Sequence, residues 1–450
     1  MANSRKLRSP SDLVAHVERI LRRTITPGQT LLLGLSGGMD SVVLLDVLAR
    51  CREPLSFKLR AVHVNHQISP NASAWAEFCR ELCAALAVPL ETATVDLQGC
   101  RGLGLEAAAR AARYQVFERQ QADFVVLAQH LDDQAETVLL QLLRGAGAKG
   151  MAAMPELATR HSALSTHLLR PLLEITRAEI ERHARQHGLR WVDDESNRDV
   201  AYDRNFMRHQ LLPLIERRFP AYRATLSRAS RNLAEAAQLL EELAQMDASV
   251  AVAQGALDIA ALRTLSPARA KNLLRHYLDG FEIAVPAARL EEMLRQLTDA
   301  PADAKVRVTL GRHELLRFQD KAWVRQRGVV VDKDSCWHWH GEQELRLDGA
   351  LGTLSFERGG GGNVSLEKLL AQPVTVRLRQ GGERLRPDCN RPRRSLKSLL
   401  QETNVPPWHR GQLPLLFCGE RLVFVPGIGV DCDFQAGPGE PALAVRWEPD

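Results

Sequence analysis

The stretch Leu31-Leu32-Leu33-Gly34-Leu35-Ser36-Gly37-Gly38-Met39-Asp40-Ser41 joins an apolar run to a polar, glycine-containing loop, and a second apolar run from Val42 to Leu48 follows it. The first run is short and continuous and the second has helical spacing, so together they predict a buried strand, a tight loop and a helix. Gly37 and Gly38 allow positive φ angles and a close approach of ligand to backbone. The amides from Ser36 to Ser41 would then converge at the positive end of the helix, where phosphate binds.

The loop differs from a Walker A loop, because it is shorter and lacks the Gly-Lys-Ser/Thr sequence that grips terminal phosphates. Ser-Gly-Gly-x-Asp-Ser resembles instead the loop of the PP-loop ATP pyrophosphatases. This resemblance implies that pyrophosphate is the leaving group, and that an acceptor oxygen attacks the α-phosphorus and becomes adenylated. The alternative is an ordinary glycine turn, which both serines and Asp40 after a buried strand disfavour.

The composition is that of a globular protein: of 450 residues, 45% are hydrophobic and 25% charged. The formal net charge of +5 is only mildly basic, so a nucleic-acid surface has to be a local patch. No apolar run is long enough to span a membrane, and the amino-terminal residues do not form a signal-peptide core. The eight cysteines include no Cys-x-x-Cys pair, so we expect reduced thiols and a cytoplasmic protein.

Strand-like and helix-like segments alternate through the first part of the chain. Strands are predicted at 31–35, 58–66, 91–97, 124–128 and 167–172, and helices at 11–23, 71–87, 106–119, 132–144 and 176–187. Such alternation predicts an α/β fold with a mostly parallel, Rossmann-like sheet, helices on both faces and ligands at the carboxyl ends of the strands.

The rest of the chain predicts two further domains. Residues 204–218 read as a helix that is broken or kinked at Pro213. The pattern is then mainly helical with short strands near 305–325, and from about 343 onward short apolar runs alternate with Gly and Pro, with one helix near 394–402. We therefore predict a catalytic domain at 1–218, a mainly helical domain at 219–330 and a small β-rich α+β domain at 340–450.

A second motif, from His130 to Thr137, follows the fourth predicted strand. Asp133 and Glu136 are three positions apart and share a helix face, and with Asp132 they gather negative charge in the first turn. An acid-rich helix start is one interpretation. The other is a site for Mg²⁺, which takes one or two carboxylates, or for the ammonium group of an amine nucleophile.

Two more segments follow. The glycines from Arg144 to Gly150 indicate either a second close-approach loop or a helix end with its turn. The polar run from Trp191 to Arg208 suits either a loop that grips a flipped base and its backbone or a solvated linker.

In this order and spacing, the four motifs resemble the tRNA(Ile)-lysidine synthase family, and the likeness extends to Arg170-Pro171-Leu172-Leu173 and to Lys397 through Gly427. The resemblance implies ligation of free L-lysine to C2 of the wobble cytidine of an isoleucine tRNA with a CAU anticodon. ATP adenylates O2 of the cytosine, the amine displaces AMP, and codon reading switches from AUG to AUA. It also implies ATP and Mg²⁺ as cofactors and tRNA binding by both later domains; a homodimer is compatible with the sequence.

Site residues follow from the same resemblance, position by position. The family pattern implies phosphate binding by Ser36 to Ser41, and contacts of His63 and Asn65 with the base and ribose. Asp40, Asp133, Glu136 and Arg113 are the expected catalytic residues, with Asp40 as the candidate Mg²⁺ ligand. Lysine is expected at Asp133, Glu136 and Glu106. The residues expected to bind tRNA are Arg198, Arg204, Asn205, Arg208, Arg391, Arg393, Arg394 and Lys397.

The last group lies in a segment dense in arginine with few acids among them, which suits phosphate contacts that do not read sequence. A solvated basic face is the alternative. Cys336, His338 and His340 would share a strand face, but the sequence offers no fourth metal ligand. The rival functions are another PP-loop tRNA-modifying enzyme such as a cytidine thiolase, a small-molecule amidating ligase, and a non-catalytic tRNA-binding protein.

Overall fold

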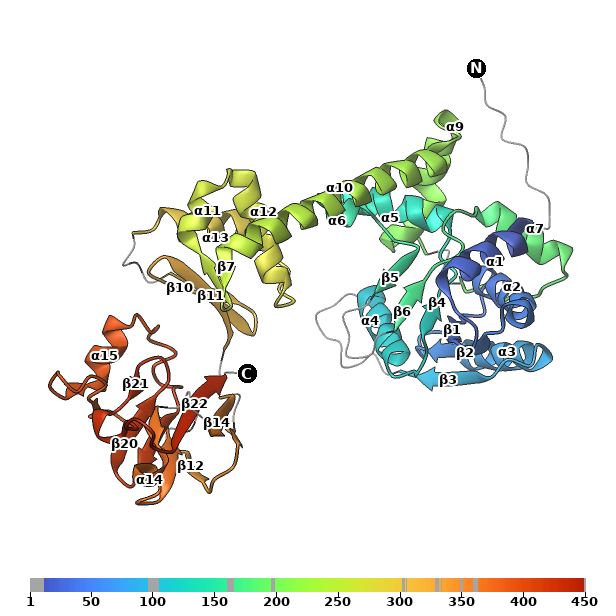
Figure 1. Ribbon diagram of the computed structural model, residues 1–450. Coiled ribbons are helices and arrows are strands. Elements are labelled where there is room, and N and C mark those ends of the chain that lie inside the picture. The colour runs from blue at the N-terminus through green and yellow to red at the C-terminus, as the bar shows by residue number, and fades with distance from the viewer. Residues whose placement is uncertain are drawn as a thin grey trace. The chain divides into compact units, whose positions relative to one another are not determined.

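The computed structural model describes residues 12–95, 105–159, 166–195, 199–301, 304, 306–327, 332, 334–348, 351–358 and 363–448. The chain forms two compact units, residues 1–242 and 243–450 (Figure 1). In the described residues, no helix combines the length and apolar character needed to cross a bilayer. The predicted division into three domains stays a prediction.

The first unit is built on a six-stranded sheet in the order β3-β2-β1-β4-β6-β5. Its strands are β1 (Thr30–Gly34), β2 (Lys58–Asn65), β3 (Leu90–Thr94), β4 (Phe124–Val126), β5 (Leu157–Thr159) and β6 (His167–Leu169). All neighbours pair in parallel except β5, which runs antiparallel to β6 at the edge. The carboxyl ends of β2, β1 and β4 therefore lie side by side, as the α/β prediction requires.

Helices cover both faces of this sheet (Figure 1). They are α1 (Asp12–Thr24), α2 (Met39–Leu55), α3 (Ala72–Ala85), α4 (Leu105–Glu118), α5 (Leu131–Leu143), α6 (Ala148–Met151) and α7 (Arg177–Gln186). Leu31 and Leu33 pack into the core formed with α1, α2, α3 and α7, whereas Leu32 packs with Phe117 of α4 on the other face. A strand buried on both faces needs a continuous apolar run, and β1 has one. The predicted fold class is confirmed.

The helix predicted over residues 204–218 changes type just before Pro213. Helix α8 (Asp203–Phe206) passes into a π-helical turn at Met207–Leu211, and α9 (Leu212–Arg218) then starts with Pro213 in its first turn, where a missing N–H breaks no helical bond. Helix α10 (Tyr222–Ala251) follows as one continuous helix of 30 residues.

The second unit begins with the sheet β7-β8-β11-β10-β9. Its elements are β7 (Val252–Ala253), β8 (Ala256–Asp258), α11 (Ile259–Thr264), α12 (Pro267–Asp279), α13 (Ala287–Asp299), β9 (Arg307–Leu310), β10 (His313–Phe318) and β11 (Lys321–Gln326). The helices pack on the sheet through Leu273, Met293 and Leu315. The strands predicted near 305–325 are confirmed, and β7 and β8 were missed because each has at most three residues.

Two antiparallel sheets form the C-terminal part, in the orders β12-β16-β19-β20-β21 and β13-β14-β22-β15, with a small pair β17-β18. The strands are β12 (Cys336–Trp339), β13 (Glu344–Arg346), β14 (Thr353–Arg358), β15 (Val364–Ser365), β16 (Val374–Arg377), β17 (Arg384–Leu385), β18 (Arg394–Ser395), β19 (Leu415–Cys418), β20 (Arg421–Val425), β21 (Gly429–Val430) and β22 (Ala442–Glu448). Helix α15 (Leu396–Glu402) is the predicted one, while α14 (Leu366–Leu369) and the 3₁₀ turn η3 (Cys432–Phe434) were not predicted.

The expectation of reduced thiols is wrong for one pair. Cys389 and Cys432 form a disulfide with their Cα atoms 5.3 Å apart. Sequence spacing gave no sign of it, because the two cysteines lie 43 positions apart and only the fold brings them together.

Candidate functional site

The loop between β1 and α2 has the geometry of an anion site. Gly37 takes a φ of +86°, and a Cβ atom there would lie 3.1 Å from the Cys79 sulfur, so the position needs glycine. The first helical bond runs from the Val42 N–H to the Gly38 carbonyl, and Gly38 provides no side-chain cap. The N–H groups of residues 39–41 thus precede the first bond and remain for a ligand.

Ser36 and Ser41 brace this loop. The Ser41 hydroxyl donates to the Gly38 carbonyl (2.9 Å) and accepts from the Ser36 N–H (3.2 Å), and the two hydroxyl oxygens lie 3.1 Å apart. Two serines around a glycine pair are therefore needed for the shape of the loop as well as for any contact with a ligand.

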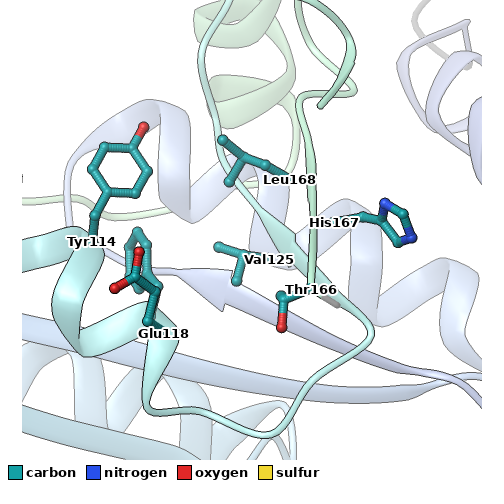
Figure 2. Close-up of a pocket in the computed structure, with 7 residues that line it drawn as sticks. Tyr114, Glu118, Val125, Thr166, His167 and Leu168 are labelled. Carbon is teal, nitrogen blue, oxygen red and sulfur yellow. The ribbon is translucent and has the colours of Figure 1, made fainter. Parts of the chain in front are cut away.

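A cavity of about 580 Å³ opens at this loop, a volume typical of small-molecule sites. Its wall comes from the loop, the end of β2, the start of α3, the end of β4, Arg177 and the segment 191–195. A second pocket lies between α4 and strands β4 and β6, where Figure 2 shows Tyr114, Glu118 and Val125 around it. Its volume of about 10 Å³ is room for one water molecule, so it cannot hold a substrate.

Asp40 lies between the loop and the start of α5. Its Oδ2 is 3.6 Å from His130 Nε2, and His130 is 1% exposed. Burial would raise the pKa of Asp40, but its interaction with His130 and the charges of His130, Arg177 and Arg208 together outweigh burial and hold that pKa below its ordinary value. The Oδ1 atom of Asp40 is buried and has no hydrogen-bond partner in the described part of the chain. An ionised, buried oxygen left without a partner beside a phosphate site fits a cation.

Asp133 and Glu136 are held by arginine. Glu136 is 1% exposed, and its carboxylate accepts from Arg204 Nε (2.9 Å) and from Arg208 Nε (2.7 Å) and Nη2 (3.1 Å). Asp133 accepts from Arg208 Nη2 (3.2 Å) and also from the His130 N–H (3.0 Å), which makes it a helix-capping residue. Arg208 lines the cavity, so the structure brings two predicted tRNA-binding arginines onto two predicted lysine-binding carboxylates.

The other predicted residues divide into three groups. His63 and Asn65 line the cavity, but His63 Nδ1 lies 2.9 Å from the Leu35 carbonyl oxygen and so braces the strand before the loop. Arg113 also lines the cavity. Arg198 and the side chain of Glu106 lie outside the described residues. Asn205 donates to the Asp199 carbonyl (2.8 Å) and is 9% exposed.

The cavity wall adds residues that were not among the predicted site residues: His66, Trp75 and Arg177. Trp191, which begins the fourth motif, lines it as well. Both ring nitrogens of His66 are buried without a hydrogen-bond partner among the described residues, and burial lowers its pKa to about 4. A neutral imidazole facing a cavity offers one donor and one acceptor to a ligand. The signal available in the sequence was position alone, since His66 directly follows the strand that carries His63 and Asn65.

Comparison with known proteins shows the family of this chain. The chain is 46% identical over 450 residues to a tRNA(Ile)-lysidine synthase of Nitrosomonas europaea, covering 100% of this chain and 98% of that protein. It is 42% identical to the tRNA(Ile)-lysidine synthase of Chromobacterium violaceum, covering 90% of this chain and 93% of that protein. The chain belongs to the tRNA(Ile)-lysidine synthase family. A U34-tRNA thiolase from Methanococcus maripaludis gives a TM-score of 0.43 at 19% identity, covering 50% of this chain and 79% of that one.

Three family models match successive parts of the chain. Residues 11–215 match the PP-loop domain, residues 257–323 the TilS substrate binding domain and residues 374–447 the TilS substrate C-terminal domain. The alternative of a Cys336, His338 and His340 metal site finds no support, because no group of three metal-ligating side chains is assembled within the described ranges.

The family model of the C-terminal domain covers the predicted basic residues Arg391, Arg393, Arg394 and Lys397. These residues differ in their charge partners. Arg391 is 71% exposed and lies 3.4 Å from the Asp388 carboxylate, and Lys397 is also exposed. Arg393 pairs with Asp431 and Asp433 at 3.1 Å each. Arg394 forms a two-pronged ion pair with Glu402. The acids that pair with Arg393 lie 38 and 40 positions away, and Glu402 lies eight positions after Arg394.

Proposed function

We propose that this protein is an ATP-dependent ligase that joins L-lysine to C2 of the wobble cytidine of the CAU-anticodon isoleucine tRNA. The observation that carries this proposal is the glycine-containing anion loop at the end of β1. It opens into a cavity that is also lined by Asp40 and Arg208. Family membership supplies the substrate class, since the relatives are named tRNA(Ile)-lysidine synthase.

The loop is proposed to bind the phosphates of ATP through the N–H groups of residues 39–41. Adenylation of the cytosine O2 breaks the bond between the α-phosphorus and pyrophosphate, so the loop has to stabilise a negative leaving group. On the β2 side of the loop, Asn65, His66 and Trp75 are uncharged and suit the base and ribose. On the β4 side, Arg208 lines the cavity and pairs with Asp133 and Glu136, which stand behind it and are proposed to attract the amine of lysine. Arg113 is proposed to steady phosphate charge.

Asp40 is proposed as the protein ligand of Mg²⁺, because its Oδ1 atom is buried and unpartnered within the described residues. Mg²⁺ needs only one or two carboxylates and takes its remaining ligands from phosphate and water. When bound, the ion would neutralise charge on the phosphates.

Lysine is proposed to bind at Asp133 in preference to Glu136. The Asp133 side chain is 14% exposed, whereas Glu136 is 1% exposed and three arginine N–H groups fill its oxygens. Glu136 then positions Arg204 and Arg208, and Arg208 orients Asp133. For this reason we propose that Arg204 and Arg208 belong to the active site when no tRNA is bound. Their contacts with tRNA stay a prediction.

The tRNA is proposed to contact Arg391 and Lys397 through its phosphates, with the cytoplasm as the location of the reaction. A homodimer is also proposed, since Met246 and Val250, one turn apart on α10, are 69% and 83% exposed. Sedimentation of the full chain tests the assembly: the mass of two copies supports it, and a single-copy mass at all concentrations contradicts it.

Incorporation of labelled lysine tests the reaction. We expect label in the CAU isoleucine tRNA only when ATP is present, with one AMP and one pyrophosphate per lysine. The matched control is the same tRNA with uridine at the wobble position, which should take up no lysine. Release of ADP, or labelling of the control tRNA, would contradict the proposed mechanism.

A further inference from the structure

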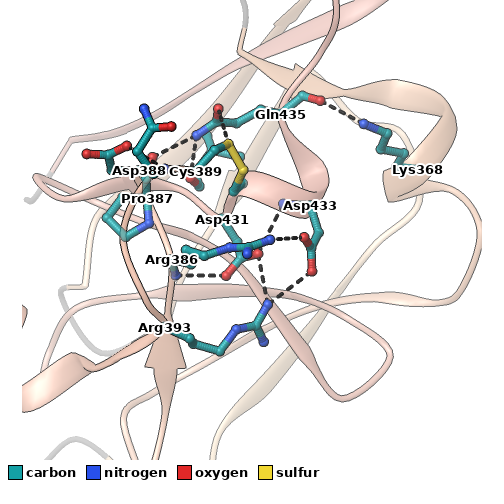
Figure 3. Close-up of a disulfide and its surroundings, with 12 residues drawn as sticks. Lys368, Arg386, Pro387, Asp388, Cys389, Arg393, Asp431, Asp433 and Gln435 are labelled. Carbon is teal, nitrogen blue, oxygen red and sulfur yellow. Dashed lines mark hydrogen bonds and ion pairs between the residues drawn. A yellow bond between two sulfur atoms is a disulfide. The ribbon is translucent and has the colours of Figure 1, made fainter.

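The disulfide between Cys389 and Cys432 ties a basic loop to a turn that carries acids (Figure 3). Cys389 is exposed in the loop between β17 and β18, and Cys432 is half-buried at the start of η3. One sulfur of the bond is therefore within reach of thiols in solution.

The loop is held to the domain by hydrogen bonds on the side that precedes Cys389. The Cys432 N–H donates to the Arg386 carbonyl (2.7 Å), the Arg386 N–H donates to Asp431 Oδ2 (2.9 Å), and Gln435 Nε2 donates to the Pro387 carbonyl (2.8 Å). These bonds fix the loop only as far as Pro387.

Beyond Pro387, the backbone N–H bonds remain inside the loop. The Asn390 N–H donates to Asp388 Oδ1 (2.9 Å), and the Arg391 N–H donates to the Asp388 carbonyl (3.1 Å). In the described part of this domain, the disulfide is thus the covalent link, apart from the backbone itself, between the loop tip and the body of the domain. Arg391, two positions after Cys389, is at this tip.

The turn that receives the disulfide also sets the local charge. Asp431 is 0% exposed and accepts from Arg393 Nη2 (3.1 Å), and Asp433 accepts from Arg386 Nη2 (2.6 Å) and Arg393 Nη2 (3.1 Å). Two arginines of the loop are thereby neutralised by the turn, whereas Arg391, 71% exposed, pairs only within the tip, with the half-exposed Asp388 at 3.4 Å. The position of the tip decides where the exposed Arg391 is presented.

We propose that Cys389–Cys432 is a redox modification site, opened by dithiol reductants, that sets how the C-terminal domain presents Arg391 to RNA phosphates. This inference rests on the proposed tRNA-binding function. Disulfides in a reducing compartment are usually transient and redox-sensing, and the exposed sulfur of Cys389 is the point of attack.

The reaction balances with a dithiol as the reductant. One thiolate attacks Cys389, breaks the sulfur–sulfur bond and forms a mixed disulfide, leaving Cys432 as a thiolate that takes up a proton. The second thiol of the reductant then displaces Cys389. Two electrons and two protons pass to the protein, and the reductant becomes a disulfide. The released tip gains conformational freedom, which has to be lost again when Arg391 binds a phosphate.

The experiment uses the full chain, treated either with oxidised glutathione or with dithiothreitol. Alkylation followed by mass measurement gives the redox state, and filter binding of the CAU isoleucine tRNA gives the Kd. We expect the disulfide in the oxidised protein and a roughly tenfold higher Kd after reduction, which corresponds to re-ordering the backbone of about one residue.

Two variants provide controls. Cys336 is exposed and outside the pair, so Cys336→Ser should respond to redox treatment as the wild type does. The double variant Cys389→Ser/Cys432→Ser should show the reduced Kd under both treatments; its far-UV spectrum checks folding, and the reduced wild type gives the same comparison without substitution.

Each adverse result has a distinct meaning. Full alkylation of both cysteines after oxidation would overturn the redox site itself, whatever the protein does with tRNA. A disulfide that forms while the Kd changes less than twofold would overturn its effect on RNA binding. Loss of tRNA binding in both states would overturn the proposed function and with it the RNA-binding part of this proposal, while the mass measurement still decides whether the site exists.

Discussion

The Glu136 carboxylate is buried among arginines, and its replacement by glutamine tests the proposed site. Its side chain is 1% exposed and accepts three hydrogen bonds from Arg204 and Arg208. Removing one partner of a buried ion pair costs about 3–5 kcal/mol. Here both arginine side chains are about a quarter exposed, and Arg208 keeps Asp133, so we expect about 2–3 kcal/mol.

That loss should lower the melting temperature of the first unit by about 4–12 °C, measured by calorimetry. Lysine incorporation should fall at least tenfold, through a higher KM for lysine, because Arg208 no longer orients Asp133. The matched control is Glu174→Gln, whose pair with Arg231 has side chains 53% and 64% exposed, and which should cost less than about 0.5 kcal/mol. Equal melting temperatures for the two variants would refute the reasoning.

Three further perturbations separate the proposed roles. Asp40→Asn should lower lysine incorporation at least roughly a hundredfold with the tRNA Kd unchanged, and a magnesium titration that matches the wild type would contradict its role as a ligand. Burial lowers the pKa of His66 to about 4, so the unfolded chain takes up the proton first as the pH falls from 6.5 toward 4. Urea unfolding should therefore show that the wild type loses on the order of 3 kcal/mol of stability over this range, whereas His66→Gln does not. Parallel stability profiles of the two proteins against pH would refute this. Arg391→Ala/Lys397→Ala should reduce the slope of log K against log salt for tRNA by about 2, and an unchanged slope would exclude both contacts.

The sequence was sufficient to predict the parallel strands of the first unit and the helices between them, because each signal was local. The continuous apolar run of β1 predicts a strand covered on both faces, and Pro213 predicts the break that became a π-helical turn. Gly37 has its positive φ angle because the loop closes within a few residues. The edge strand β5 was missed, since its three residues carry no pattern that distinguishes a strand from a loop.

The contacts of the predicted site residues depend on pairs that are remote in sequence. Glu136 and Arg204 lie 68 positions apart, and each was read from its own neighbours: the acid as a ligand of lysine, the arginine as a contact of tRNA. The fold joins them because α5 and α8 are adjacent at the edge of the site. His66 was missed for the opposite reason, because its importance comes from having no partner, which no local pattern can indicate.

Charge along the sequence therefore differs from charge available to a ligand. In the C-terminal basic segment, Asp431 and Asp433 pair with Arg393 and Glu402 pairs with Arg394. Arg391 pairs with the exposed Asp388 at 3.4 Å but is itself 71% exposed, so Arg391 and Lys397 are the predicted positions most open to solvent. Counterion release follows the charges that reach phosphate, so the segment should bind RNA with a weaker salt dependence than its arginine count predicts. Because the turn that supplies Asp431 and Asp433 also receives the disulfide, opening that bond frees the tip that carries Arg391 and leaves the neutralised pairs in place.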